Sequence, residues 1–391
     1  MAIFGATGSV GRQALDVVRQ HSERLEVRAL AAHRDAVGLA ALAREFRPQA
    51  VALTDARAAV PELAEGEWRF LQGEGTLEAV FQECKIDLLL AATPGLVALR
   101  SVIGALRRGI PVALANKEVL VAAGDLVEEA LVEGGSALIP VDSEHVAIHM
   151  ALRDELPDAV SRLVLTCSGG PFRTWSSEAI AEANPAQALR HPNWRMGSLI
   201  TVNSATLMNK GLEVLEAHRL FGWPIDGIEV VVHPQSVIHS LVTLKDGSML
   251  AQLAGPDMRL PIQYALLYPD RRVSSLEPPD LVRIGSLTFE PVRSQAFPAL
   301  SLATRAGKLG GTAPAVLVAA NEEAVSAFLQ GRIGFSDIAA LVEGTLGQIP
   351  SHPVASAEDV EAAQGLAREF VRGWLEDHPQ HVVSRRKGEV V

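Results

Sequence analysis

The stretch Gly5-Ala6-Thr7-Gly8-Ser9-Val10-Gly11 decides the fold of this 391-residue chain. It follows the short apolar run Met1–Phe4 and opens a segment whose apolar residues, Ala14, Leu15 and Val18, recur at helical spacing. Glycines at this spacing allow a tight strand-to-helix turn, and a helix N-terminus favours a pyrophosphate. The pattern therefore predicts a dinucleotide-binding turn, with a purely structural turn as the alternative.

The residues that follow repeat the same strand and helix pattern as far as about Val141. Helical segments such as Gly11–Gln20 and Val37–Phe46 alternate with apolar runs of strand length. These runs are Leu25–Ala32, Ala50–Leu53, Asp87–Ala92, Pro111–Ala115 and Ala137–Val141. Such alternation predicts an α/β fold, with a Rossmann-like, doubly wound parallel sheet in a dinucleotide-binding domain at residues 1–141.

The pattern changes beyond Ser143. A helix is predicted over Ser204–Phe221, and the hairpin signal Lys245-Asp246-Gly247 joins two of the predicted strands. Those strands are Leu163–Thr166, Ile228–Val232, Ser236–Leu244 and Ser248–Leu253. We expect an α+β catalytic domain at residues 142–268, a proline-rich linker at 269–298, and a C-terminal α-helical domain at 299–391.

Composition excludes several classes of protein. With 48% hydrophobic and 21% charged residues, the chain is globular. Its 35 Lys and Arg against 46 Asp and Glu give a net charge of −11, which argues against nucleic-acid or membrane partners. Two cysteines make neither a disulfide framework nor a four-ligand zinc site, and with no targeting or membrane-spanning segment they predict a cytoplasmic protein.

Two short motifs bear on cofactors. The second predicted strand ends at His33-Arg34, where NAD-specific proteins usually place an acid, so a basic residue favours the 2′-phosphate of NADPH. An ordinary surface arginine is the alternative.

Asp142-Ser143-Glu144 follows another strand end, and its oxygen ligands suit Mg²⁺ or Mn²⁺. A solvated acidic surface or a helix N-cap is the alternative there.

Further motifs predict an anion site and a lid. Ser204 is a candidate N-cap, and Asn209, Lys210 and Glu213 share one helix face, which is typical of a phosphate cradle with a third metal ligand or of a solvated Lys/Glu pair. Ser168, followed by two glycines, offers a second anion-binding turn. The segment His191–Gly197 lacks periodicity and predicts either a lid that closes over substrate or a structural loop.

Over nearly its whole length the chain resembles the 1-deoxy-D-xylulose 5-phosphate reductoisomerase family. The motifs that carry the resemblance are Gly5–Gly11, Ala115-Asn116-Lys117-Glu118, Pro140-Val141-Asp142-Ser143-Glu144-His145, Ser168-Gly169-Gly170-Pro171-Phe172-Arg173, His191-Pro192-Asn193-Trp194, Ser204–Glu213, His233-Pro234-Gln235-Ser236, Met258-Arg259-Leu260-Pro261-Ile262 and Ala320-Asn321-Glu322. This chain departs from the family in Ala32-His33-Arg34-Asp35, where Gly-Lys/Arg-Asn is frequent, and in His149-Met150, where Phe-Gln is common.

The resemblance implies a homodimer that isomerises and reduces 1-deoxy-D-xylulose 5-phosphate with NADPH and Mg²⁺ or Mn²⁺, a step of non-mevalonate isoprenoid biosynthesis. It implies three metal ligands, Asp142, Glu144 and Glu213. Catalysis would involve these three with Lys117 and His191. The substrate would meet Ser143, Ser168, His191, Trp194, Ser204, Asn209 and Lys210. The cofactor would meet Gly5, Thr7, Gly8, Ser9, Val10, His33, Arg34, Asn116, Lys117, Glu118 and Gly197.

Two other functions compete with this one. A homoserine-dehydrogenase-like oxidoreductase explains the N-terminal domain but requires neither Asp142-Ser143-Glu144 nor the Ser204–Glu213 segment, so metal dependence separates the two. A non-catalytic NADP-sensing or scaffold protein is the other alternative, but it leaves the acidic residues without a purpose. A turnover assay separates this function from an enzymatic one.

Overall fold

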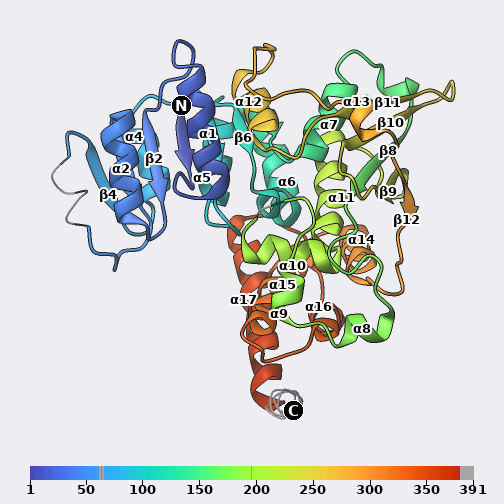
Figure 1. Cartoon of the computed structure of the whole chain (residues 1–391). Coiled ribbons are helices and arrows are strands. Elements are labelled where there is room, and N and C mark those ends of the chain that lie inside the picture. The colour runs from blue at the N-terminus through green and yellow to red at the C-terminus, as the bar shows by residue number, and fades with distance from the viewer. Residues whose placement is uncertain (61–62, 64–65, 195, 379–391) are drawn as a thin grey trace. The chain divides into compact units, whose positions relative to one another are not determined.

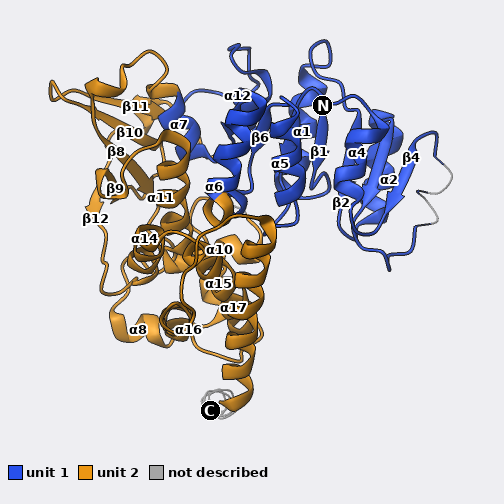
Figure 2. Ribbon diagram, turned by 180° about the vertical axis from the view of Figure 1, so that it is seen from behind, with its two compact units in different colours: residues 1–120, 124–149, 257–278 blue, residues 121–123, 150–256, 279–391 orange. Residues whose placement is uncertain are grey.

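The structure is a computed structural model that describes residues 1–60, 63, 66–194 and 196–378 (Figure 1). It divides into two compact units, drawn in blue and orange in Figure 2. Unit 1 comprises Met1–Leu120, Gly124–His149 and Asp257–Pro278, and unit 2 comprises Val121–Ala123, Met150–Pro256 and the chain from Pro279 onward. These units follow packing, so the functional division at residues 141, 268 and 298 stays a prediction.

Unit 1 is built on a seven-stranded parallel sheet in the order β4-β3-β2-β1-β5-β6-β7. Its central strand β1 pairs with β2 on one side and β5 on the other, so that Ile3 lies opposite both Leu30 and Leu90. The strand order reverses at β1, which makes the turn after β1 the place where such sheets bind ligands. The strands are β1 (Ala2–Phe4), β2 (Ala29–Ala32), β3 (Ala50–Leu53), β4 (Arg69–Gln72), β5 (Leu89–Ala91), β6 (Val112–Leu114) and β7 (Leu138–Pro140).

Helices cover this sheet, and β1, β2, β3, β5 and β6 are buried along their whole length, whereas the edge strand β4 is exposed at both of its ends. One of the helices, α12, comes from far along the chain and packs against α1. The helices that lie wholly or largely in unit 1 are α1 (Ser9–Gln20), α2 (Ala36–Phe46), α4 (Thr76–Glu83), α5 (Leu99–Arg107), α6 (Lys117–Gly134), α7 (Ser143–Ala151) and α12 (Arg259–Leu267). The predicted Rossmann-like fold is confirmed.

Unit 2 contains a five-stranded mixed sheet in the order β11-β10-β8-β9-β12. The predicted hairpin joins β10 to β11, with Gly247 at a φ of +91° in its turn. Within the predicted linker lie the short helix α13 (Leu281–Ile284) and β12, whose Glu290 pairs with Val232 of β9. The strands are β8 (Val160–Cys167), β9 (Ile228–Val232), β10 (Ile238–Leu244), β11 (Met249–Leu253) and β12 (Glu290–Pro291).

The helices of unit 2 correct one prediction. The chain does not form a single helix over Ser204–Phe221 with Ser204 as its N-cap, because Leu207 adopts a left-handed φ of +63° and separates two helices. Ser204 therefore lies inside the first of them. The helices are α8 (Ser177–Ala181), α9 (Pro185–Ala188), α10 (Ser198–Thr206), α11 (Met208–Phe221), α14 (Ala299–Leu309), α15 (Ala313–Leu329), α16 (Phe335–Gln348) and α17 (Ala357–Asp377), the last four forming the expected helical region. None of the helices in the described residues has the length and apolarity needed to cross a bilayer.

Candidate active site

The glycine-rich turn after β1 has no space for side chains at two positions. Gly5 has a φ of +87°, and a Cβ there would lie 2.3 Å from the Ala92 carbonyl oxygen. A Cβ on Gly11 would lie 2.3 Å from the Gly5 carbonyl oxygen. Gly8 is the N-cap of α1 and is exposed, as is Ser9 beside it. The turn thus presents bare backbone at a helix N-terminus, a geometry that fits a pyrophosphate.

Basic side chains gather where β2 and β3 end. Arg34 is 72% exposed and donates from Nε to Asp55, 2.8 Å away and 16% exposed. His33 Nδ1 lies 2.9 Å from the Thr54 hydroxyl. The backbone N–H of Arg57, with the guanidinium of Arg34, holds the pKa of the Asp55 carboxyl below its ordinary value. Arg34 is thus held from one side while its guanidinium remains open to a ligand.

The carboxylate of Asp35, which follows Arg34, is hydrogen-bonded to the backbone. Asp35 is the N-cap of α2, and its carboxylate accepts the N–H of Gly38 at 2.8 Å. A carboxylate used in this way is poorly placed to accept a ribose hydroxyl. The end of β2 therefore favours the 2′-phosphate of NADPH over the free ribose hydroxyl of NADH.

Asn116 has a structural task that the sequence did not reveal. Its side chain is buried, caps α6 by accepting the Val119 N–H, and donates to the carbonyl oxygens of Thr93 and Gly95. It ties the loop after β5 to the start of α6. Lys117, the first residue of α6, is thereby fixed in orientation, and Glu118 follows in the same first turn.

The first pair of predicted metal ligands lies where β7 runs into α7. The ammonium group of buried Lys117 pairs with the carboxylate of Asp142. The Ser143 hydroxyl donates to the Glu144 carboxylate one residue along. His145, which sequence reasoning did not single out, is completely buried in the same turn. Its spacing of three residues from Asp142 was the available signal.

The third predicted ligand lies in unit 2 on α11. Glu213 is 2% exposed, and its carboxylate pairs with the ammonium of Lys210 and accepts from the Asn209 amide at 2.5 Å. The predicted common helix face of these three residues is confirmed. Glu216, one helical turn further, is also completely buried and was missed by sequence reasoning. Buried carboxylates are costly unless they are paired or coordinate a metal, so two of them on one helical turn mark a candidate functional site.

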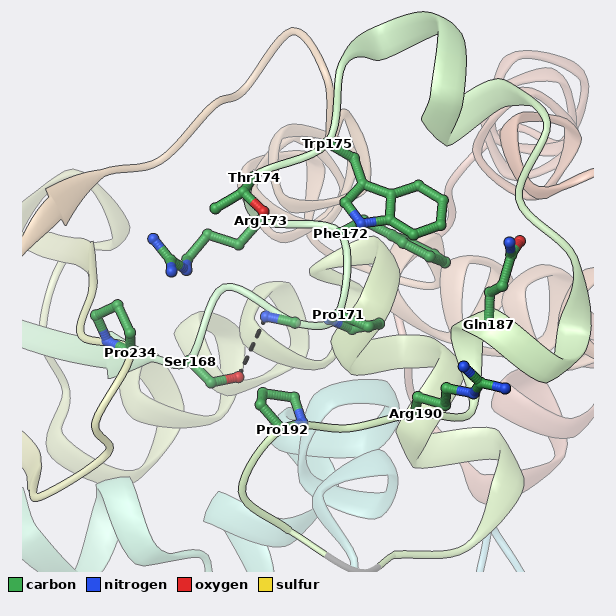
Figure 3. Close-up of a pocket in the computed structure, with 11 residues that line it drawn as sticks. Ser168, Pro171, Phe172, Arg173, Thr174, Trp175, Gln187, Arg190, Pro192 and Pro234 are labelled. Carbon is green, nitrogen blue, oxygen red and sulfur yellow. Dashed lines mark hydrogen bonds between the residues drawn. The ribbon is translucent and has the colours of Figure 1, made fainter.

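The Ser168 turn is seated against α10. Gly169 and Gly170 have φ angles of +80° and +69°, and a Cβ on Gly170 would lie 2.8 Å from the Ser204 carbonyl oxygen. The Ser168 hydroxyl accepts the Gly170 N–H at 3.2 Å. In the view of Figure 3, Arg173 and Arg190 lie on opposite sides of an adjoining cavity of about 370 Å³. Ser168 and Ser204 are therefore brought together by close backbone packing.

The loop that was predicted as a lid is anchored through its first residues. Nδ1 of His191 accepts the backbone N–H groups of Asn193 and Trp194, at 3.2 and 2.9 Å. The ring proton therefore sits on Nε2, which faces the Ser168 hydroxyl at 3.1 Å. Gly197 is exposed and caps α10, whereas Arg195 lies outside the described residues.

The donor set fits the implied metal. Asp142, Glu144 and Glu213 supply carboxylate oxygens only, which is what Mg²⁺ and Mn²⁺ prefer. Lysines accompany two of these carboxylates at low exposure, because Lys117 pairs with Asp142 and Lys210 pairs with Glu213. Asp142 and Glu144 lie two residues apart where β7 runs into α7 in unit 1, and Glu213 lies on α11 in unit 2.

Family models match most of the chain. The model for 1-deoxy-D-xylulose 5-phosphate reductoisomerase matches residues 1–124, and that for its C-terminal domain matches residues 138–221. A third model, for the DXP reductoisomerase C-terminal domain, matches residues 253–370.

Individual proteins agree with the family models. The chain is 49% identical to the 1-deoxy-D-xylulose 5-phosphate reductoisomerase of Cupriavidus pinatubonensis, over 96% of this chain and 98% of that protein. It is 46% identical to the Gloeobacter violaceus enzyme, over 98% and 99%. The Zymomonas mobilis reductoisomerase, solved with NADPH, superposes with a TM-score of 0.88 at 40% identity, covering 96% and 98%. A reductoisomerase solved with NADPH, fosmidomycin and magnesium gives 0.88 at 37%, with the same coverage.

Proposed function

The chain belongs to the 1-deoxy-D-xylulose 5-phosphate reductoisomerase family, and we propose that the residues assembled above form its active site. The enzyme isomerises 1-deoxy-D-xylulose 5-phosphate and reduces it to 2-C-methyl-D-erythritol 4-phosphate, using NADPH and a divalent metal. The observation that carries the site assignment is the buried Glu213 carboxylate with Lys210 and Asn209 as partners.

NADPH binds in unit 1 in this proposal. The backbone of Gly5, Thr7, Gly8, Ser9 and Val10 holds the pyrophosphate. His33 and Arg34 hold the 2′-phosphate, supported by the exposed guanidinium and the capping role of Asp35. Asn116, Lys117, Glu118 and Gly197 are the other proposed cofactor contacts, and Asn116 also ties the loop after β5 to the start of α6.

The proposed ligands of the metal are Asp142, Glu144 and Glu213. A bound divalent ion supplies Lewis-acid stabilisation of negative charge on the reacting oxygens. Lys117 pairs with the Asp142 carboxylate, and Ser143 orients the Glu144 carboxylate through its hydroxyl. These contacts prepare two of the carboxylates for a cation.

The substrate phosphate binds to residues of unit 2, and Ser143 of unit 1 is a further proposed substrate contact. Ser168, Ser204, Asn209 and Lys210 hold its phosphate, far from the reacting carbons, so that binding energy there positions the reacting end. His191 donates from Nε2, because its Nδ1 accepts two backbone N–H groups. Trp194 covers the substrate with its apolar face and excludes water.

The proposal extends to assembly and location. A homodimer is proposed from the family resemblance, and β11, which pairs only with β10 in the described sheet, offers an open edge for association. A cytoplasmic location is proposed because Cys84 and Cys167 form no disulfide in the described part of the chain. Size-exclusion chromatography with light scattering tests the dimer directly.

The site assignment is tested by Glu213→Gln. This change keeps the shape of the side chain but removes a negative charge from the proposed metal site. We expect kcat at saturating Mg²⁺ to fall more than about tenfold, a loss above about 1.4 kcal/mol, with NADPH affinity unchanged.

Glu369→Gln is the matched control, because Glu369 is an exposed glutamate of α17 in the same unit. It should change neither quantity. A Glu213→Gln variant that keeps more than about a tenth of the wild-type kcat removes Glu213 from the set of direct metal ligands.

A further inference from the structure

Two buried asparagines connect the helical C-terminal region to the candidate phosphate site. Asn321 of α15 donates from its amide nitrogen to the side-chain oxygen of Asn203 of α10 at 2.9 Å. The residues are 2% and 3% exposed and stand 118 positions apart in the chain. Asn203 immediately precedes Ser204, and Asn321 belongs to the motif Ala320-Asn321-Glu322, to which the proposed function assigns no role.

This polar pair lies on a helix that is otherwise apolar where it is buried. The buried positions of α15 are, apart from Asn321, alanine, valine, leucine, phenylalanine and a proline. Helix faces made of such small apolar side chains pack well in more than one register, whereas a directional hydrogen bond permits one. Within the described chain, nothing donates to the side-chain oxygen of Asn321, a cost that an apolar residue would avoid. Stability alone therefore does not account for Asn321.

The helix that Asn203 holds ends in a strained junction. The Thr206 hydroxyl donates to the Asn203 carbonyl oxygen and accepts the N–H of Met208, both at 3.2 Å, so it bridges α10 and α11. Leu207 between them is buried at a φ of +63°, a conformation that a leucine keeps only when its surroundings impose it. The angle between α10 and α11 is thus determined by side-chain contacts at this junction.

The junction sets the spacing between two parts of the phosphate site. Ser204 lies on α10, and Asn209 and Lys210 lie on α11. Close packing holds α11 against α14, because a Cβ on Gly211 would lie 2.5 Å from the Cβ of Ala303. Since α11 is fixed in this way, any shift of α10 along α15 moves Ser204 relative to Asn209 and Lys210.

We propose that Asn321 is a positioning residue for the substrate phosphate. Through Asn203 it holds α10 in the register that lets Ser204 and the α11 side chains reach one phosphate group. The inference rests on the proposed function of Ser204, Asn209 and Lys210. It assigns to the C-terminal helices a part in substrate binding, in addition to their packing role.

Asn321→Leu tests the proposal, because leucine keeps the branching and the number of heavy atoms of the side chain but has no hydrogen-bonding group. We expect the KM for 1-deoxy-D-xylulose 5-phosphate to rise about tenfold or more, with KM for NADPH and kcat changed less than about threefold. Asn203→Leu removes the same bond from its other end. The double variant should raise KM no further than either single change, within about twofold, because both act on one contact.

Thr345→Val is the matched control. Thr345 is completely buried in α16, and its hydroxyl donates to the Leu341 carbonyl oxygen of the same helix, so this variant removes a hydrogen bond of the helical region that involves neither Asn203 nor Asn321. It should leave the KM for substrate unchanged. If Asn321→Leu does not fold, Asn321→Ser, whose hydroxyl is too short to reach Asn203, replaces it with the same expected result.

The outcomes separate this inference from the proposed function. A wild-type enzyme that does not turn over the substrate overturns the proposed function. A wild-type enzyme that turns it over, combined with an Asn321 variant of unchanged substrate KM, overturns the positioning role alone. A parallel fall in kcat and rise in both KM values overturns it as well, because a general loss of packing would produce that result.

Discussion

Replacing Gly170 by alanine introduces a methyl group for which the structure has no space. The new Cβ would lie 2.8 Å from the Ser204 carbonyl oxygen and 3.1 Å from the Ala205 Cα, and Gly170 has a φ of +69°. The left-handed conformation costs a non-glycine residue about 1–2 kcal/mol. Overlap with backbone atoms adds about 1–3 kcal/mol, so the total is about 2–5 kcal/mol.

The Ser168 turn can relieve part of this overlap by moving away from α10. Such a movement separates Ser168 from Ser204, so that the two serines can no longer both contact the substrate phosphate. We expect the KM for 1-deoxy-D-xylulose 5-phosphate to rise by about tenfold or more, which corresponds to about 1.4 kcal/mol. NADPH binding should be unaffected, because the Gly5–Gly11 turn lies in unit 1.

Gly222→Ala is the control that separates strain from overlap. Gly222 ends α11 with a φ of +61°, and a Cβ there meets nothing within 4 Å. Urea unfolding should show a loss of about 1–2 kcal/mol for this variant. Steady-state kinetics should show no change in KM. If the two variants lose the same stability and Gly170→Ala leaves the substrate KM unchanged, the Ser168 turn does not pack closely against α10.

Two further variants test cofactor choice and the lid. Arg34→Ala should raise the KM for NADPH about tenfold to a hundredfold, because a charge-assisted contact of about 1.5–3 kcal/mol is lost, and should hardly change that for NADH. Equal effects in the two cofactor assays would assign the 2′-phosphate elsewhere, with His33 as the next candidate. Trp194→Ala should lower kcat/KM for the substrate in steady-state assays and leave the Mg²⁺ affinity of the free enzyme unchanged, as measured by calorimetry. An unchanged kcat/KM would favour the structural interpretation of the loop.

Local features of this protein could be predicted from sequence, and features that depend on packing could not. The glycine-rich turn and the common face of Asn209, Lys210 and Glu213 follow from spacings of three to six residues, which backbone geometry determines directly. The break at Leu207 has no such signal, because leucine is a strong helix former and only its surroundings impose the left-handed conformation.

Long-range contacts were the other feature that sequence patterns did not reveal. The two-residue strand β12 is too short to show a period, so its pairing with β9 was not foreseen. Asn203 and Asn321 meet across 118 residues, and nothing near either residue indicates the other. The candidate site was therefore predicted as separate motifs, whereas the contacts that orient these motifs required the structure.

The central claim is that this chain is a metal-dependent reductoisomerase that uses NADPH. The most direct measurement follows NADPH oxidation with 1-deoxy-D-xylulose 5-phosphate in the presence of Mg²⁺, after chelation of metal, and after Mg²⁺ is restored. We predict oxidation with Mg²⁺, loss of activity on chelation and recovery on restoration, with 2-C-methyl-D-erythritol 4-phosphate as the product. Oxidation that persists without metal, or none under any condition for the folded protein, would contradict the claim.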